Sequence, residues 1–162
     1  MVDQIPQSLP LLFSFKQVVV GNGFVAGVEM NGRALLETDR VDGREEAWIT
    51  GIESVGISGG GGDRGLVFGE FRKSWTLVVF DLAEQAQDFQ EFKSLCETFL
   101  ASNQPNMTQL WTDAVAVVRQ SHYVDASLGR EDASQKVTFK VLDLANMRPD
   151  HNKVENGVQV AA

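Results

Sequence analysis

Cysteine and histidine are scarce in this sequence, and their scarcity excludes two classes of protein. The 162 residues include one cysteine, Cys96, and two histidines, His122 and His151. A lone cysteine forms no internal disulfide, so the chain is not a disulfide-stapled scaffold and fits a reducing compartment. Metal centres need clustered His, Cys or carboxylate ligands. We therefore predict no metal ion and no other cofactor, and we interpret both histidines as structural or surface residues.

Basic residues are also few. Lys and Arg number 14 against 22 Asp and Glu, which gives a formal net charge of −8. Nucleic-acid affinity depends on Lys and Arg contacts to phosphate groups, so direct nucleic-acid binding is not expected. An acidic surface fits either simple solvation or a basic protein partner.

Long apolar runs are missing as well. No segment approaches the roughly 20 apolar residues of a membrane span. Residues 1–10 contain no Lys or Arg, whereas a signal peptide starts with a basic region. We therefore expect a cytoplasmic protein without a membrane partner.

No recognisable catalytic constellation is present. The G-x-S-x-G elbow of serine hydrolases is missing. The carboxylate pairs Glu45–Glu46 and Glu84 with Asp88 are expected on solvated surfaces, as is Arg72–Lys73. Cys96 falls on the apolar face of a predicted helix, where burial raises the pKa of a thiol and makes it inert. The prediction is a protein that is not an enzyme.

The first third of the chain predicts an antiparallel meander. Short runs rich in β-branched and aromatic residues alternate with turn residues such as Gly and Asn. Neighbouring strands joined by short turns usually pair with each other. The predicted strands are 11–20, 24–30, 33–38 and 47–57, with hairpin turns at 21–23 and 31–32, and a charged loop at 39–46. The segment 47–57 fits either one strand or two short pieces.

The spacing of apolar residues changes after four consecutive glycines. From Val67 to Leu82 they recur every three or four positions, which is the period of one helix face. Asp63 is a suitable N-cap, because its carboxylate can accept hydrogen bonds from the first turn. Trp75–Phe80 alone would suit a strand, but the pattern is too long for one. A second helix is predicted over Asp88–Ala101.

The C-terminal third is less regular. Met107–Arg119 fits either a helix or a buried strand, and we leave both open. A polar loop is predicted at 128–134 and a strand at 136–144. The predicted organisation is a loose lead-in over 1–10, one domain over 11–145 with a core at 11–103 and an extension at 107–145, and a disordered tail at 146–162.

The predicted fold class is a two-layer α+β fold. An antiparallel meander sheet would bury one face under the helices. The residues expected to point into this layer are Phe13, Phe15, Val19, Val25, Val28, Trp48, Ile52, Phe71, Trp75, Val78, Phe92, Phe99 and Val137.

The glycine run is the one candidate for a nucleotide site. The segment at 60–65 fits G-x-G-x-x-G between a strand and a helix, which is the context of a dinucleotide fingerprint. However, the preceding strands form a meander rather than a βαβ unit, and an acid at the mouth repels phosphate. A flexible connection is therefore the preferred interpretation. The candidate residues are Gly60, Gly62, Asp63, Arg64 and Gly65.

The order of elements resembles the HicB-like antitoxin family. The meander ends in Trp48-Ile49-Thr50-Gly51-Ile52-Glu53-Ser54-Val55-Gly56-Ile57-Ser58, followed by glycines, an Asp and a helix with Phe71, Trp75 and Val79. The resemblance covers about residues 11–84. Gly51 stands where the family has proline, and Arg64 where it has threonine. The resemblance implies a non-catalytic protein that masks a small basic ribonuclease toxin, and it carries over no site residue.

Three functions remain open from the sequence. The first is a non-enzymatic protein-interaction module that neutralises a basic partner. The second is a small-molecule or nucleotide binder, or an enzyme, that uses the loop at 59–65. The third is a structural subunit that forms homo-oligomers.

Overall fold

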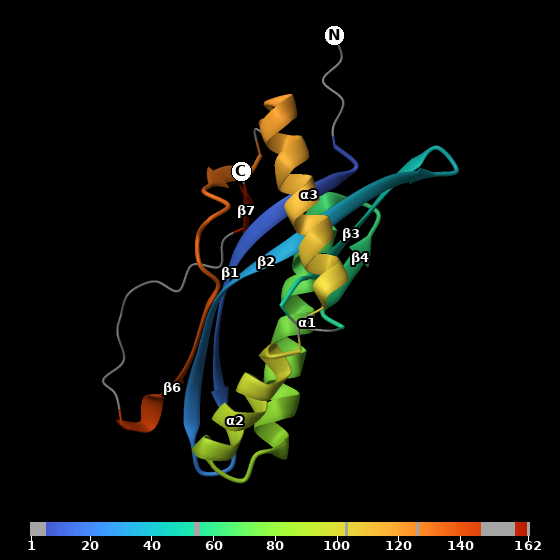
Figure 1. The fold of residues 1–162 in the computed structure, drawn as a ribbon. Coiled ribbons are helices and arrows are strands. Elements are labelled where there is room, and N and C mark those ends of the chain that lie inside the picture. The colour runs from blue at the N-terminus through green and yellow to red at the C-terminus, as the bar shows by residue number, and fades with distance from the viewer. Residues whose placement is uncertain (1–5, 54–55, 103, 126, 147–157, 162) are drawn as a thin grey trace.

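The protein is an α+β fold with helices packed on a sheet, as the sequence predicts. The sheet is mixed and mostly antiparallel, whereas the prediction is a purely antiparallel one. The computed structural model describes residues 6–53, 56–102, 104–125, 127–146 and 158–161 (Figure 1). Within these residues the sheet order is β4-β3-β2-β1-β7-β5, and β6 pairs with β2. The elements are β1 (Ser8–Val20), β2 (Val25–Val41), β3 (Arg44–Gly51), β4 (Ser58–Gly61), α1 (Arg64–Gln85), α2 (Phe89–Leu100), α3 (Pro105–Ser121), β5 (Gly129–Glu131), β6 (Thr138–Asp143), the 3-10 helix η1 (Leu144–Asn146) and β7 (Val158–Ala161).

The first predicted hairpin turn is confirmed. Strands β1 and β2 pair from Val20 and Val25 down to Ser8, and the turn between them closes with a hydrogen bond from the Gly21 amide to the Phe24 carbonyl. Gly23 has a φ of 73°, a conformation that glycine adopts without steric cost. The longest ladder of the sheet therefore starts at the turn that the sequence marks most clearly.

The second predicted hairpin turn, at Asn31-Gly32, is wrong. Strand β2 continues through it, and Gly32 pairs with Phe13 of β1. A Cβ atom on Gly32 would lie 2.8 Å from the Phe13 ring, so this glycine leaves room for an aromatic side chain instead of making a turn. The segments predicted as two strands are one long strand.

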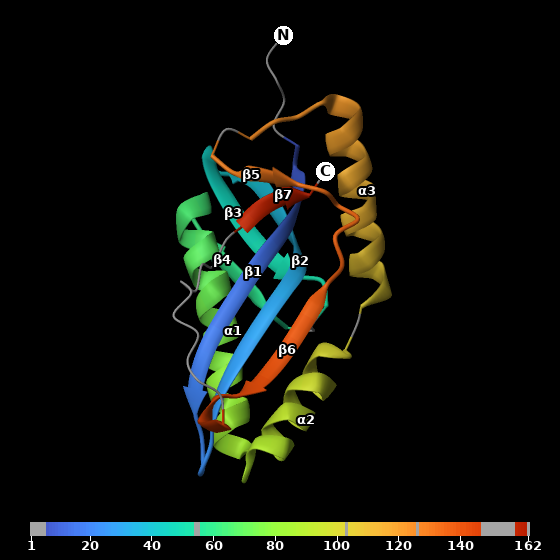
Figure 2. The same ribbon diagram turned by 90° about the vertical axis from the view of Figure 1, so that its left-hand side faces the viewer.

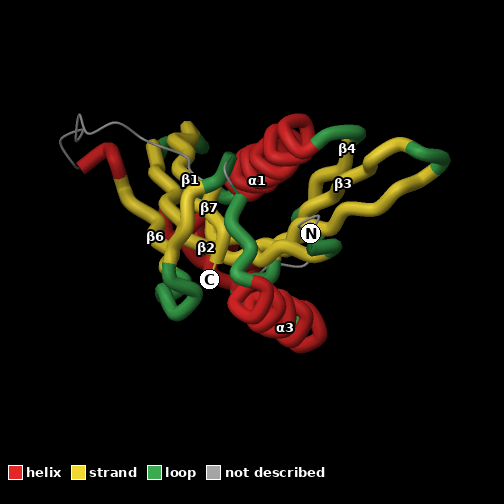
Figure 3. Tube along the Cα trace, turned by 90° about the horizontal axis from the view of Figure 1, so that it is seen from above, coloured by secondary structure: helices red, strands yellow, loops and turns green. Residues whose placement is uncertain are grey.

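The predicted loop at 39–46 is a hairpin arm. Strands β2 and β3 continue to Val41 and from Arg44, and Asp42 and Gly43 form the turn with φ values of 51° and 78°. Two positive φ values define the type I′ turn that suits a two-residue hairpin, and Asp-Gly is one of its preferred sequences. Figure 3 shows this arm reaching beyond both flanking helices.

The glycine run is strand β4 rather than a flexible connection. It pairs with β3, and the predicted strand at 47–57 ends at Gly51. A Cβ atom on Gly59 would lie 2.5 Å from the backbone nitrogen of Phe71, so helix α1 can approach β4 only because a glycine is there. Helix α1 begins as predicted, with the Asp63 carboxylate accepting a hydrogen bond from the Leu66 amide at 3.0 Å.

Helices α1 and α2 cover one face of the sheet. Phe13 packs edge-to-face on Phe71 with ring centroids 5.0 Å apart, and Trp75 contacts Phe99 of α2. Of the predicted inward residues, seven are buried in this layer: Phe13, Phe15, Val19, Val28, Phe71, Trp75 and Phe92. Ile52 is buried as well, but on the opposite face of the sheet, in the core with α3. Val25, Val78 and Phe99 are half-buried. Trp48 and Val137 were wrongly predicted, because both are exposed.

The segment left open at 107–119 is helix α3. Figure 3 shows α1 and α3 on opposite sides of the sheet, so helices cover both faces rather than the single face that the sequence predicts. Helix α3 buries Trp111, Ala114 and Val115 against Leu12 and Leu35, a second and smaller core. The helical spacing therefore prevails over the β-branched composition.

Both ends of the described chain are more ordered than predicted. Strand β1 starts at Ser8, inside the predicted lead-in, and Leu9 is buried. The predicted polar loop at 128–134 contains β5, and the predicted strand at 136–144 is β6. In the predicted tail, β7 pairs with β1 beside β5 (Figure 2). Val160 belongs to the core under α1, and Ala161 belongs to the smaller core with α3. Residues 1–5 and 147–157 of the predicted lead-in and tail lie outside the described residues.

Candidate functional site

The predicted glycine-loop residues do not converge on a cradle. Asp63 caps α1, and Arg64, the first residue of that helix, donates to the Asp125 carboxylate at 2.6 Å. A Cβ atom on Gly60 or Gly62 would meet no atom within 4 Å, so neither glycine marks a close approach. Gly65 lies in the first turn of α1, against the Asp63 carboxylate. Asp63 and Arg64 therefore both stabilise the start of helix α1.

Asp125 is the most strongly anchored carboxylate of the described chain. It is 9% exposed and accepts hydrogen bonds from Arg64, from Tyr123 and from both the amide and the hydroxyl of Ser127. Burial raises the pKa of Asp125, but the hydrogen bonds from Ser127 and the Arg64 guanidinium outweigh it and lower this pKa to about 2. The cluster ties the loop after α3 to the start of α1, which is a structural role.

The thiol and the described imidazole do not lie together in a reactive site. Cys96 is buried on α2 as predicted, and burial, with a smaller effect of Glu97, raises the pKa of its thiol to about 12. His122 ends α3 in the left-handed conformation, with a φ of 52°. His151 lies outside the described residues. Among the described residues, no group of three or more His, Cys, Asp or Glu side chains is placed to hold a metal ion.

The other predicted surface residues are exposed. Arg72–Lys73 and Glu84 lie on the outer side of α1, and Asp88 caps α2 by accepting from the Glu91 amide at 2.8 Å. Glu45–Glu46 are exposed in β3 rather than in a loop. Arg72 lines a depression of about 180 Å³ together with Phe68 and Trp75. Of the acidic residues, only Glu46 belongs to a surface with a pattern of its own.

That surface is one side of the β2–β3 arm, which we call the acidic arm face: Glu37, Asp39, Val41, Arg44, Glu46 and Trp48. Directly opposed residues of two strands share a side of the sheet. Here Asp39 stands opposite Glu46, so two carboxylates face each other. On the other side of the arm, Arg40 stands opposite Glu45, a favourable pair. Like charges directly opposite destabilise a strand pair, so this face departs from what stability alone favours.

An exposed tryptophan lies next to the opposed carboxylates. Trp48 is 37% exposed, and its indole N–H donates to the Glu37 carboxylate at 2.8 Å. Tryptophan at a protein surface is typical of contact sites, because it offers a large apolar area and a polar handle. The acidic arm face therefore combines unbalanced negative charge with an aromatic contact residue.

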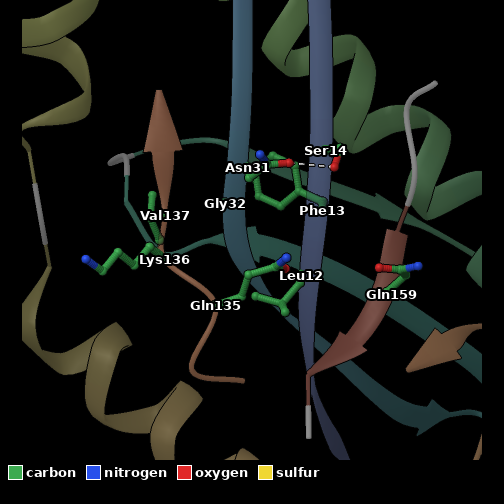
Figure 4. Close-up of a pocket in the computed structure, with 9 residues that line it drawn as sticks. All are labelled: Leu12, Phe13, Ser14, Asn31, Gly32, Gln135, Lys136, Val137 and Gln159. Atoms are coloured by element: carbon green, nitrogen blue, oxygen red, sulfur yellow. Dashed lines mark hydrogen bonds between the residues drawn. The ribbon is translucent and has the colours of Figure 1, made fainter. Parts of the chain in front are cut away.

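A polar hollow lies on the same side of the sheet, beyond α3. Two adjoining depressions of about 220 and 340 Å³ share Ser14 and Asn31 in their floor. In Figure 4 the Gln135 side chain reaches toward β2, whereas Lys136 points away from it. The Ser14 hydroxyl donates to Asn31 at 2.7 Å, and the Asn31 amide donates to Thr138 at 2.9 Å. The floor is thus a continuous row of polar side chains across three strands.

Comparisons with known proteins identify no relative. The chain matches no protein-family model, no curated protein and no solved structure. The resemblance to the HicB-like antitoxin family stays a prediction. Within the described residues, no helix has the length and apolar character needed to cross a membrane.

Sequence reasoning missed both surfaces. The sequence analysis predicts a loop at the arm, although Asp42-Gly43 between two charged runs is a type I′ turn sequence that could reveal a hairpin. The hollow has no such local sequence pattern. It forms because β6 pairs with the first half of β2, a contact between positions more than 100 residues apart.

Proposed function

We propose that this protein is a non-enzymatic interaction module that binds a basic protein partner through the acidic arm face. The proposal depends on one observation, the opposed carboxylates of Asp39 and Glu46 beside the exposed Trp48. Positions 37–46 carry five acids and two arginines. A cationic side chain from a partner would relieve the repulsion between the two carboxylates. This relief would contribute favourably to the free energy of binding.

The shape of the arm supports the same function. The arm extends past α1 and α3 (Figure 3), so a partner can reach it without displacing either helix. The resemblance to the HicB-like antitoxin family implies a small basic ribonuclease as the partner. The overall charge of −8 favours fast association with such a protein.

A pull-down from the native host with a charge-matched control tests the proposal. Asp39→Lys with Glu46→Lys reverses the charge of the acidic arm face. Asp81→Lys with Glu84→Lys makes the same change in net charge on the exposed side of α1. We expect the wild-type protein and the α1 variant to retain a basic protein that the arm variant loses, with retention weakening as salt is raised.

Two outcomes would contradict the proposal. One is that no basic protein is retained by the wild type. The other is that both double variants lose the partner equally, which would point to net charge rather than to the arm. Circular dichroism of each variant separates loss of binding from loss of fold.

A further inference from the structure

The polar hollow differs in charge from the rest of the molecule. Its wider part is lined by two lysines, Lys16 and Lys140, and one carboxylate, Glu29. This local balance is positive in a chain whose net charge is −8. The three residues form one row across β1, β2 and β6, next to the row of Ser14, Asn31 and Thr138.

The two lysines have different surroundings. Lys16 lies 3.8 Å from the Glu29 carboxylate. Lys140 faces the same carboxylate from β6, but among the described residues it forms no ion pair, and it is exposed. The Lys140 ammonium group is therefore the cation that an incoming anion would meet at this end of the hollow.

The other end is suited to hydroxyl groups. Asn31 is held by Ser14 on one side and Thr138 on the other, which fixes the orientation of its amide. Thr138 accepts from Asn31 and keeps its own O–H to donate. The amides of Gln135 and Gln159 complete the narrower part of the hollow (Figure 4). Amides and hydroxyls can both donate to and accept from a ligand hydroxyl.

We propose that the hollow binds a small hydroxylated anion, of the size of a sugar phosphate or a hydroxy acid, with its charged group at Lys140 and its hydroxyls over Asn31 and Thr138. The wider part, about 340 Å³, lies at the lower end of the range of small-molecule sites. This site is separate from the acidic arm face and from the glycine run. A negative result for this site would therefore not contradict the proposed function, and a failure of the proposed function would not contradict this site.

Calorimetric titration tests the site. The probes are ribose 5-phosphate, citrate and ribose, which separate a phosphate, a carboxylate and an uncharged hydroxyl ligand. At least one of the two anions is expected to bind the wild-type protein at millimolar concentration or below, and ribose more weakly. Lys140→Gln should weaken anion binding about tenfold, because a charge-assisted hydrogen bond is lost. Thr138→Val should weaken it less.

Matched substitutions elsewhere serve as controls. Lys73→Gln on α1 and Thr112→Val on α3 remove the same groups from other exposed positions and should leave the affinity within about twofold. The proposal is overturned if neither anion binds at millimolar concentration, if ribose binds as tightly as ribose 5-phosphate, or if Lys73→Gln weakens binding as much as Lys140→Gln.

Discussion

The two faces of strand β2 have different chemistry. Toward α1, the strand presents a continuous buried row: Ala26, Val28, Met30, Ala34 and Leu36. Toward α3, only Leu35 belongs to a core, with polar residues of the hollow on one side of it and acids of the arm on the other. The face toward α1 carries most of the buried apolar area of β2, whereas the other face is buried only where α3 packs on Leu35 and carries the two surfaces that we propose bind a partner and a ligand.

The largest expected difference in the free energy of unfolding is between alanine substitutions of two tryptophans. Trp75→Ala should lower the free energy of unfolding by about 3–5 kcal/mol, because it empties the layer under α1. Trp48→Ala, on the acidic arm face, should lower it by less than about 1 kcal/mol. Urea unfolding measures both values. Equal losses would mean that the arm is part of the folding core.

The next effect concerns the link between α1 and the loop after α3. Arg64→Met should lower the free energy of unfolding by about 3 kcal/mol, since it leaves the buried Asp125 carboxylate without its cation. Arg72→Met removes the same charge from an exposed position of α1 and serves as the control. A similar small loss in both variants would show that the ion pair contributes little.

The same carboxylate predicts a pH dependence. The pKa of Asp125 is lowered from 3.8 to about 2 in the folded protein, so its contribution is complete above pH 3.8 and is lost as the pH falls toward 2. In the interval between pH 3.8 and about 2, the free energy of unfolding of the wild-type protein should fall toward that of Asp125→Asn. Unfolding curves measured across it check the prediction, and two parallel stability profiles would contradict it.

The smallest effect separates the two sides of the arm. Glu46→Lys replaces a repulsive pair with Asp39 by an attractive one and should raise the free energy of unfolding by roughly 0.2–1 kcal/mol. Glu45→Lys places a cation opposite Arg40 and should lower it by a similar amount. Thermal unfolding at low salt measures the difference, and shifts of the same sign would refute the assigned register.

The sequence predicts the α1 side of the sheet well and the other side poorly, for a physical reason. A helix that buries Val67, Phe71 and Trp75 must repeat them at its own period, so α1 can be recognised locally. The same holds for α2. The start of β2 is likewise marked by a turn sequence. Apolar periodicity can be recognised within a short segment of sequence, and it marks the face of an element that is buried on folding.

The remaining elements depend on long-range pairing. Strand β7 has four residues, too few for a pattern, and is held by β1 at the far end of the chain. Gly32 and Gly59 look like turn residues. Instead, Gly32 leaves room for the Phe13 ring, and Gly59 leaves room for helix α1. The hollow and the acidic arm face are polar, so no hydrophobic period marks them. The Asp42-Gly43 turn sequence could have revealed the arm, whereas the residues of the hollow could be found only once β6 was aligned with β2.

Mapping the contact surface by NMR shows whether a basic partner binds the acidic arm face. The isotopically labelled protein would be titrated with the basic protein retained in the pull-down. We predict that amide shifts concentrate in residues 37–48, on the arm. Shifts that concentrate on the outer side of α1 and leave the arm unchanged would contradict the account.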